Sequence, residues 1–397
     1  MKRRFAGWSG ARGAVGSALL LVTIAVLSAC GGRNGQGSPP SFDAARSYTV
    51  PYGESAVVAI SDLDGDGRPD LVAANYLNLL ADEEDNSVSV LLNRGDGSFR
   101  ASRDYRSAYG AASVAIGDVN GDSRPDLAQM GTGTVSVFIN KGNGSFHARR
   151  EYRTGIGADA YPIAIGDLNG DGKLDLVTAK VAADRPGAVS VLLNWGDGNS
   201  QAKLAYRTIF GRDLHDLNGD GKPDVVFENC DDADSVSVLL NRGDGSFRAR
   251  QDYPTPSAPC GLAIGDLNGD GKPDLAIANY DSDTVSVLLN RGDGSFQAKV
   301  DYATRLSPES VAIGDLDGDG KPDLVTANED DPGGVSVLLN KGDGSFRTKL
   351  DYGTWSAYSV AIGDLNGDGK PDLVTGNEGN TDSGANTVSV LLSKTGE

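Results

Sequence analysis

The chain has 397 residues, and its 55 acidic against 36 basic residues give a formal net charge of −19 at pH 7. This charge disfavours nucleic acid and anionic membrane surfaces as partners, because their phosphates would be repelled. Only two histidines occur, His147 and His215, which disfavours zinc sites and most acid–base chemistry.

Residues 1–29 have the pattern of an export signal, with a basic start before an apolar run over residues 18–27. The run is too short to span a bilayer well. The signal ends in Leu-Ser-Ala before Cys30, and this segment resembles the lipobox of bacterial lipoproteins, in which the cysteine is lipidated. We expect lipidation at Cys30 and a flexible tether over residues 30–40. The protein would then lie in a bacterial cell envelope, held to a membrane by lipid and facing the periplasm or the cell surface.

From residue 41 to residue 397 a unit of about 50 residues recurs. Its acidic landmark, D-L-N-G-D-G-K-P-D, occurs seven times, and a second landmark, V-S-V-L-L-N-R-G-D-G-S-F, follows it in most units. Each unit predicts four strands, which in one unit cover residues 311–314, 324–326, 335–339 and 346–352. Seven four-stranded units predict an all-β, seven-bladed β-propeller.

The two ends of the repeat array predict how the ring closes. The last unit stops after its third strand, at residues 388–392, and residues 41–48 match the fourth-strand segment at residues 98–105. We therefore expect the N-terminal strand to complete the seventh blade, since an open sheet would expose an edge.

The acidic landmark is a nine-residue loop with side-chain oxygens at positions 1, 3, 5 and 9 and a backbone carbonyl at position 7. Donors of this type and number suit Ca²⁺, and without a cation the three or four carboxylates of each loop would repel one another. We predict up to seven calcium ions, one per blade. The predicted ligands, with position 7 contributing its carbonyl oxygen, are Asp62, Asp64, Asp66, Arg68, Asp70, Asp118, Asn120, Asp122, Arg124, Asp126, Asp167, Asn169, Asp171, Lys173, Asp175, Asp216, Asn218, Asp220, Lys222, Asp224, Asp266, Asn268, Asp270, Lys272, Asp274, Asp315, Asp317, Asp319, Lys321, Asp323, Asp364, Asn366, Asp368, Lys370 and Asp372.

An EF-hand would also begin D-x-D-x-D-G, but it requires a glutamate at position 12. None of the seven loops has one; the residues there are Ala73, Gln129, Thr178, Phe227, Ile277, Thr326 and Thr375. The flanking segments favour strands rather than helices. The loop of the second blade has Ser123 where the others have glycine, which predicts a weaker site.

On these motifs, residues 41–397 resemble the FG-GAP/VCBS-type repeats, the family that includes the propeller of integrin α subunits. The resemblance implies that the loop between strands one and two binds Ca²⁺ on the bottom face of the ring. The family includes adhesion proteins, lectins and some polysaccharide-processing proteins. The resemblance therefore implies the fold more firmly than the activity.

Arg-Gly-Asp begins at Arg94, Arg242 and Arg291. Equivalent positions carry Lys-Gly-Asn and Trp-Gly-Asp, so the tripeptide is better explained as a hairpin turn than as an adhesion signal.

Cys230 and Cys260 lie in predicted top-face loops of neighbouring blades. An exported protein reaches an oxidising compartment, and we therefore predict a disulfide between them.

The loops on the top face, opposite the metal loops, vary most between units, as binding loops on a rigid scaffold do. They carry acidic residues 82–85 and aromatic side chains that suit sugar or protein contacts: Tyr52, Tyr76, Tyr109, Tyr161, Tyr280, Trp355 and Tyr358.

The inner strand of the fourth blade is irregular, with Asp213 and His215 on one face. This pair is either functional or the mark of a degenerate repeat.

Two functions follow. The first is a monomeric binding or adhesion scaffold for a glycan or an extracellular protein, attached to a membrane only by its lipid. The alternative is a polysaccharide lyase or hydrolase with a top-face active site. The alternative lacks a Ser-His-Asp or Cys-His set, and we assign no catalytic residues. A deep top-face pocket around Asp213 and His215 would favour the enzyme.

Overall fold

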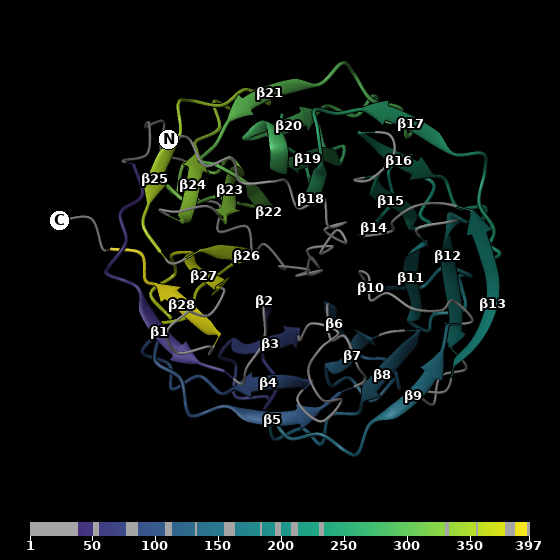
Figure 1. The fold of residues 1–397 in the computed structure, drawn as a ribbon, viewed down its shortest axis with the longest axis horizontal. Helices are drawn as coiled ribbons and strands as arrows, with labels where there is room; N and C mark the ends of the chain where they lie inside the picture. Colours follow the sequence, from purple (N-terminus) through teal and green to yellow (C-terminus); the bar gives the residue numbers. More distant parts are fainter. Residues whose placement is uncertain are drawn as a thin grey trace, which may run out of the picture.

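The computed structural model describes residues 39–50, 55–76, 86–107, 113–131, 133–154, 163–182, 185–194, 200–207, 213–229, 234–329, 333–354, 356–377 and 386–394. Within these residues the chain forms seven four-stranded antiparallel sheets arranged as blades around an axis (Figure 1). The predicted seven-bladed propeller is confirmed. No helix of the described residues is long and apolar enough to cross a membrane, and the predicted signal peptide and Cys30 lie outside them.

The blades follow one another in chain order. Blades 1 to 3 comprise β2 (Ser55–Ser61), β3 (Asp70–Tyr76), β4 (Ser87–Leu91) and β5 (Arg103–Arg106); β6 (Ser113–Gly117), β7 (Asp126–Gly131), β8 (Thr134–Phe138) and β9 (Arg150–Arg153); β10 (Ile163–Gly166), β11 (Asp175–Ala182), β12 (Arg185–Asn194) and β13 (Ser200–Arg207). Blades 4 and 5 comprise β14 (Asp213–His215), β15 (Asp224–Asn229), β16 (Ser235–Leu239) and β17 (Gln251–Pro254); β18 (Pro259–Gly265), β19 (Asp274–Asn279), β20 (Thr284–Leu288) and β21 (Val300–Ala303), with the short 3₁₀ helix η1 (Tyr280–Ser282) after β19. Blades 6 and 7 comprise β22 (Pro308–Gly314), β23 (Asp323–Asn328), β24 (Gly334–Leu338) and β25 (Leu350–Tyr352); β26 (Ala357–Gly363), β27 (Asp372–Asn377), β28 (Thr387–Leu391) and β1 (Arg46–Thr49).

The N-terminal strand closes the ring as expected. β1 pairs antiparallel with β28, with Arg46 opposite Val390 and Thr49 opposite Thr387. Upstream of β1, Phe42 forms a bridge with Ser393, and its ring packs edge-on against Tyr352 of blade 6 at a centroid distance of 5.0 Å. Residues 42–49 therefore join the last blade to its neighbour, and the seventh sheet has its fourth strand.

The apolar core is divided among the interfaces between blades. Each of seven buried clusters combines residues of two neighbouring blades, and the cluster that joins blade 7 to blade 1 contains Leu365, Val374, Val58 and Leu71. Inner strands end in small residues because they lie close together. A Cβ added to Gly314 would lie 3.0 Å from Cδ1 of Ile362 in the next blade, a distance that leaves no room for a side chain.

The fourth strand is shorter than its sequence predicts. We expected residues 346–352 to form one strand, but β25 covers only Leu350–Tyr352 and Phe346 makes a separate bridge with Asn340. Phe346 is buried in the core between blades 5 and 6. The residues between Phe346 and β25 do not pair regularly with strand three of the blade. The reason is that Phe346 must enter the core directly after the hairpin turn.

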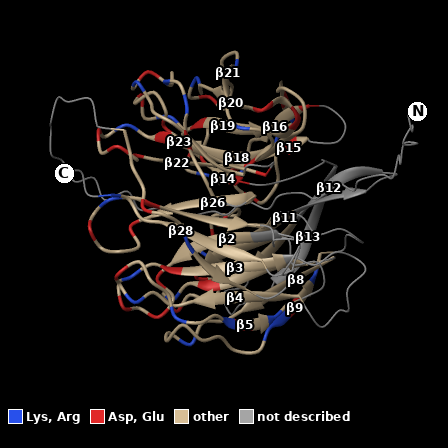
Figure 2. Ribbon diagram, turned by 60° about the vertical axis from the view of Figure 1, so that its left-hand side comes forward, with Lys and Arg blue, Asp and Glu red and all other residues tan. Residues whose placement is uncertain are grey.

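The acidic loop joins strands one and two of every blade, and in blades 1, 2, 4, 5 and 6 a Gly-Asp-Gly or Gly-Asn-Gly turn joins strands three and four. Both connections therefore lie on the same face of the ring, which we call the metal-loop face. The remaining connections lie on the opposite face. Figure 2 shows the charged loops of the metal-loop face gathered on one side of the propeller.

Candidate metal centres

The acidic loops share one backbone conformation, which the first aspartate organises. In blade 5, Oδ1 of Asp266 accepts hydrogen bonds from the backbone N–H groups of Gly269 at 2.8 Å and Asp270 at 3.1 Å, and Oδ2 accepts one from Gly271 at 2.8 Å. The other loops repeat this pattern around Asp62, Asp118, Asp167, Asp216, Asp315 and Asp364. The loop wraps around its first carboxylate, whose remaining lone pairs can still bind a cation.

The third and fifth positions continue the turn. Oδ1 of Asn268 accepts the N–H of Asp270 at 2.8 Å, and Oδ1 of Asp270 accepts the N–H of Lys272 at 3.0 Å. These hydrogen bonds orient the side chains of alternate residues in the loop. The donor set consists only of oxygen, the ligand type that suits Ca²⁺.

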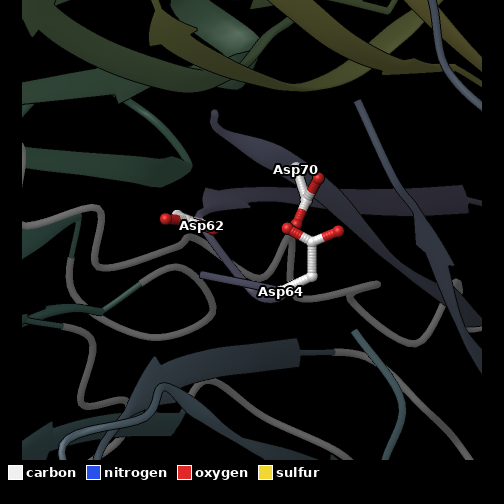
Figure 3. A group of neighbouring side chains, drawn as sticks. All are labelled: Asp62, Asp64 and Asp70. Carbon is white, nitrogen blue, oxygen red and sulfur yellow. The ribbon is translucent and has the colours of Figure 1, made fainter. Parts of the chain in front are cut away.

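Two loops have aspartate rather than asparagine at the third position. In these loops the carboxylate oxygens of Asp62, Asp64 and Asp70, and those of Asp315, Asp317 and Asp323, gather with one oxygen of each within 4.8 Å of the others. Figure 3 shows the carboxylates of Asp64 and Asp70 pointing toward one another. Like charges at this distance repel, so a divalent cation would be held by positions 1, 3 and 9 of the loop.

The ninth aspartate is buried in all seven loops. Asp274 is 0% exposed, and its carboxylate accepts the backbone N–H of Leu267 at 3.0 Å and of Asn290 at 2.7 Å. Burial raises the pKa of Asp274 to about 6, and the neighbouring Asp270 and Asp266 add to the rise. The ninth aspartates of blades 1, 2, 3, 4 and 7 have a pKa raised to about 6 for the same reason, and that of Asp323 is raised to about 7.

In blades 1 to 6 an asparagine after strand three connects to the loop of the preceding blade; blade 7 has Ser393 at this position. Asn290 Nδ2 donates to the backbone carbonyl of Pro273 in its own loop and to that of Leu217 in the loop of blade 4, both at 2.9 Å. The same bond to the preceding loop is made by Asn93, Asn140, Asn194, Asn241 and Asn340, at 2.5 to 3.0 Å. Asn93 bonds to Leu365 and so joins blade 1 to blade 7. Sequence analysis assigned these asparagines no role, although their fixed place in the repeat was a signal.

The seventh position has a second role. Its side chain forms an ion pair with the fifth aspartate in blades 1, 3, 4, 5 and 6, and this pair is exposed in all of them except blade 6, where the Asp319 side chain is buried. Exposed pairs of this kind add little stability. The side chain also covers the glycine of the following turn, since a Cβ added to Gly292 would lie 2.8 Å from Cδ of Lys272.

The Arg-Gly-Asp tripeptides form hairpin turns, as the sequence indicates. Oδ1 of Asp96 accepts hydrogen bonds from the N–H of Ser98 at 3.0 Å and from its Oγ at 2.6 Å. Both bonds hold the pKa of Asp96 below its usual value, and the bond from the Ser98 hydroxyl has the larger effect. The carboxylate of the tripeptide is therefore committed to the turn.

The remaining candidate residues lie in several places. Asp213 and His215 flank the buried Leu214 in β14 and so share a face, but His215 is paired with Asp224 at the metal-loop end of the strand. This places them away from the opposite face, where the enzyme hypothesis needed them.

Cys260 Sγ lies 3.2 Å from the carbonyl oxygen of Pro308. Cys230 lies outside the described residues, and the disulfide stays a prediction. Also outside them are Tyr52, Tyr109, Tyr161, Trp355 and residues 82–85.

Comparisons with known proteins agree with this architecture. The model of the FG-GAP-like repeat matches residues 62–129, 118–178, 216–277, 266–326 and 315–375. A solved structure of an Agrocybe aegerita lectin that recognises non-reducing terminal N-acetylglucosamine is similar with a TM-score of 0.52 and 23% identity, over 78% of this chain and 82% of the lectin chain. BBS1N, solved in complex with ARL6DN, is similar with a TM-score of 0.55 and 13% identity, over 89% of this chain and 97% of its own. No curated protein matches this chain.

Ser123 provides a test of the loop geometry. It has a φ of 66°, in the left-handed region that glycine occupies in the other loops, and its N–H makes the expected bond to Asp118 Oδ2 at 2.7 Å. The loop of blade 2 is therefore intact but strained. Ser123→Gly should stabilise the protein by roughly 0.5–1 kcal/mol in chemical denaturation, because relief of the strain exceeds the added entropy of the unfolded chain. Ser123→Ala, the control, keeps the strain and should change little; equal effects of both substitutions would contradict this reading of the loop.

The buried ninth aspartates predict an inverted pH dependence for metal-free protein. Their pKa is higher in the folded chain, at about 6 to 7, than the ordinary 3.8. The folded state therefore binds more protons, so this contribution to stability is present at low pH and is lost as pH rises toward 7. In EGTA, the melting temperature should rise when pH is lowered from about 7.5 to about 5. With calcium, which replaces the protons, that rise should disappear; the same pH profile with and without calcium would contradict the prediction.

Proposed function

Because the chain belongs to the FG-GAP-like repeat family, we propose that it is a calcium-stabilised β-propeller that binds carbohydrate through the face opposite its metal loops. Seven calcium ions would reduce the formal charge of −19 to −5, an ordinary value for a protein of this size. The metal-loop face is committed to the ions and to blade-to-blade bonds, whereas the loops of the opposite face vary and are available to bind a partner.

The observation that carries the proposal is a carboxylate shared by three blades. Tyr280 in η1 of blade 5 donates its hydroxyl to Oε2 of Glu329 at 2.6 Å, and Tyr358 in β26 of blade 7 donates to Oε1 at 2.8 Å. Glu329 follows β23 of blade 6, and all three side chains are partly buried. The two phenols hold the carboxylate in one orientation on the face opposite the metal loops.

This arrangement suits the hydroxyl groups of a sugar. Each carboxylate oxygen of Glu329 keeps a lone pair that can accept a hydroxyl hydrogen. Burial, followed by the hydrogen bond to Glu329, raises the pKa of Tyr280 above its usual value, so the phenol remains a donor at neutral pH. Tyrosine also offers an apolar ring beside a polar tip, a combination that suits the mixed surface of a sugar. The lectin's recognition of N-acetylglucosamine supports carbohydrate as the ligand class.

A glycan array probed with the calcium-loaded propeller tests the proposal. We expect one or more glycans to bind, and Glu329→Gln to weaken that binding by about ten- to a hundredfold, as loss of a hydrogen bond to a charged group implies. Tyr253→Phe is the control, because its hydroxyl lies on the outer strand β17, where it bonds to Gln251 and to the backbone of Phe296 and not to Glu329. The proposal fails if no glycan binds or if both variants retain the affinity of the parent.

We further propose that the protein is exported and anchored by lipid at Cys30. The support is the apolar segment that ends in Leu-Ser-Ala-Cys, and several acyl chains anchor a protein stably where one does not. Cys30→Ser should move the protein from the membrane fraction to the soluble fraction of cells. Equal membrane retention of the variant and the parent would rule the anchor out.

A further inference from the structure

The outer strands of blades 1 and 2 carry a concentration of positive charge. Six arginines lie on or beside β5 and β9, and all are exposed: Arg100, Arg103, Arg106, Arg149, Arg150 and Arg153. We call this set the basic rim. Figure 2 shows β5 and β9 coloured for basic residues at the periphery, away from the acidic loops of the metal-loop face. The patch exists in a chain whose net charge is −19.

The basic rim is not a requirement of the fold. The first and last residues of β5 and of β9 are arginine, but the matching residues of β17, β21 and the segment of β25 are uncharged: Gln251 and Pro254, Val300 and Ala303, Leu350 and Gly353. Those blades form the same four-stranded sheet. β1 of blade 7 begins with Arg46 and β13 of blade 3 ends with Arg207, so the two flanking blades carry one arginine each, and only β5 and β9 carry the pair.

Three of the six arginine side chains of the basic rim have no internal partner within the described residues. On blades 4, 5 and 6, Arg250, Lys299 and Lys349 each pair with an aspartate two residues on. On the rim, Arg149 pairs with Glu151 and donates to the backbone carbonyls of Arg106 and Ser107 of blade 1. Within the described residues, the side chains of Arg100, Arg103 and Arg153 form no hydrogen bond or ion pair.

The chemistry of the patch indicates its partner. An arginine side chain binds carboxylate groups through two parallel N–H donors, and a row of arginines requires a row of anions. Arg103 and Arg106 stand at the two ends of β5, roughly 10 Å apart at the usual rise of a strand, and their side chains leave opposite faces of the strand because they are three residues apart. A linear polymer with a carboxylate on every second sugar has charges at a similar spacing, and it reaches both arginines when it crosses the outer edge of the strand.

Two other polyanions fit less well. Single-stranded nucleic acid needs exposed aromatic rings on which bases stack, whereas Tyr105 packs edge-on against Phe138 and Phe146 and Tyr152 packs against the core. A membrane is flat, whereas the rim of the ring is convex over two blades (Figure 1). A flexible chain can follow this curve.

We propose that the basic rim binds a linear anionic polysaccharide whose charges are uronate carboxylates. This site lies on the outer strands and is separate from Glu329 on the face opposite the metal loops. It does not depend on the carbohydrate site proposed above, and either site can fail without the other.

The test uses the purified full chain with calcium and unsulfated chondroitin as the probe, with carboxyl-reduced chondroitin as its neutral counterpart. The variant is Arg103→Ser with Arg153→Ser. The matched control is Arg242→Ser with Arg248→Ser, which removes the same charge from exposed arginines of blade 4. A melting curve confirms that each variant is folded. Glu329→Gln, measured in parallel, separates this site from the other.

We expect the parent to bind chondroitin and not its reduced form. The rim variant should bind about tenfold more weakly, with a shallower dependence on salt between about 50 and 200 mM, because fewer counterions are released. The blade 4 control and Glu329→Gln should bind like the parent. The proposal is overturned if chondroitin does not bind, if the control loses as much affinity as the rim variant, or if duplex DNA or anionic vesicles bind more tightly than chondroitin.

Discussion

The carboxylate at the ninth position of each acidic loop is buried beside other carboxylates of the same loop, and the architecture depends on how that charge is neutralised. In blade 5 this group, on Asp274, bonds to the N–H of Leu267 in the loop and to that of Asn290 in the next turn. Asn290 then donates to the loop of the preceding blade. One charged group thus connects the loop, the hairpin and, through the asparagine, the neighbouring blade. A bound cation would strengthen all three connections together.

The contacts that join the blades and the surfaces that vary between blades lie on different parts of the molecule. The metal-loop face carries the repeated bonds that join the blades, so its sequence is nearly the same in every unit. The opposite face and the outer strands carry no such bonds in every repeat and can differ from blade to blade. The shared carboxylate of Glu329 and the basic rim both occur where the repeat varies. The ring is therefore a scaffold that is stabilised on the metal-loop face, while the opposite face and the outer strands are free to bind partners.

Much of this architecture follows from the sequence, because the information is local and repeated. Seven acidic loops at nearly constant spacing predict seven blades, and the match of residues 41–48 to a fourth strand predicts the closure seen between β1 and β28. Contacts between blades could not be predicted. Asn290 bonds to a residue 73 positions earlier, and Glu329 meets tyrosines 49 positions before it and 29 after it. Such contacts depend on how the sheets pack. The position of His215 beside the metal loop also needed the strand register.

We propose that calcium in the loops stabilises the contacts between blades. Amide hydrogen exchange of the full chain, followed by mass spectrometry with calcium and with EGTA, measures this effect. Removal of calcium should speed exchange at the loop residues Leu217 and Leu267 and also at the turns that begin at Asn290 and Asn340, which bond to those loops. Faster exchange confined to the loops, or no change at all, would show that calcium does not act between blades.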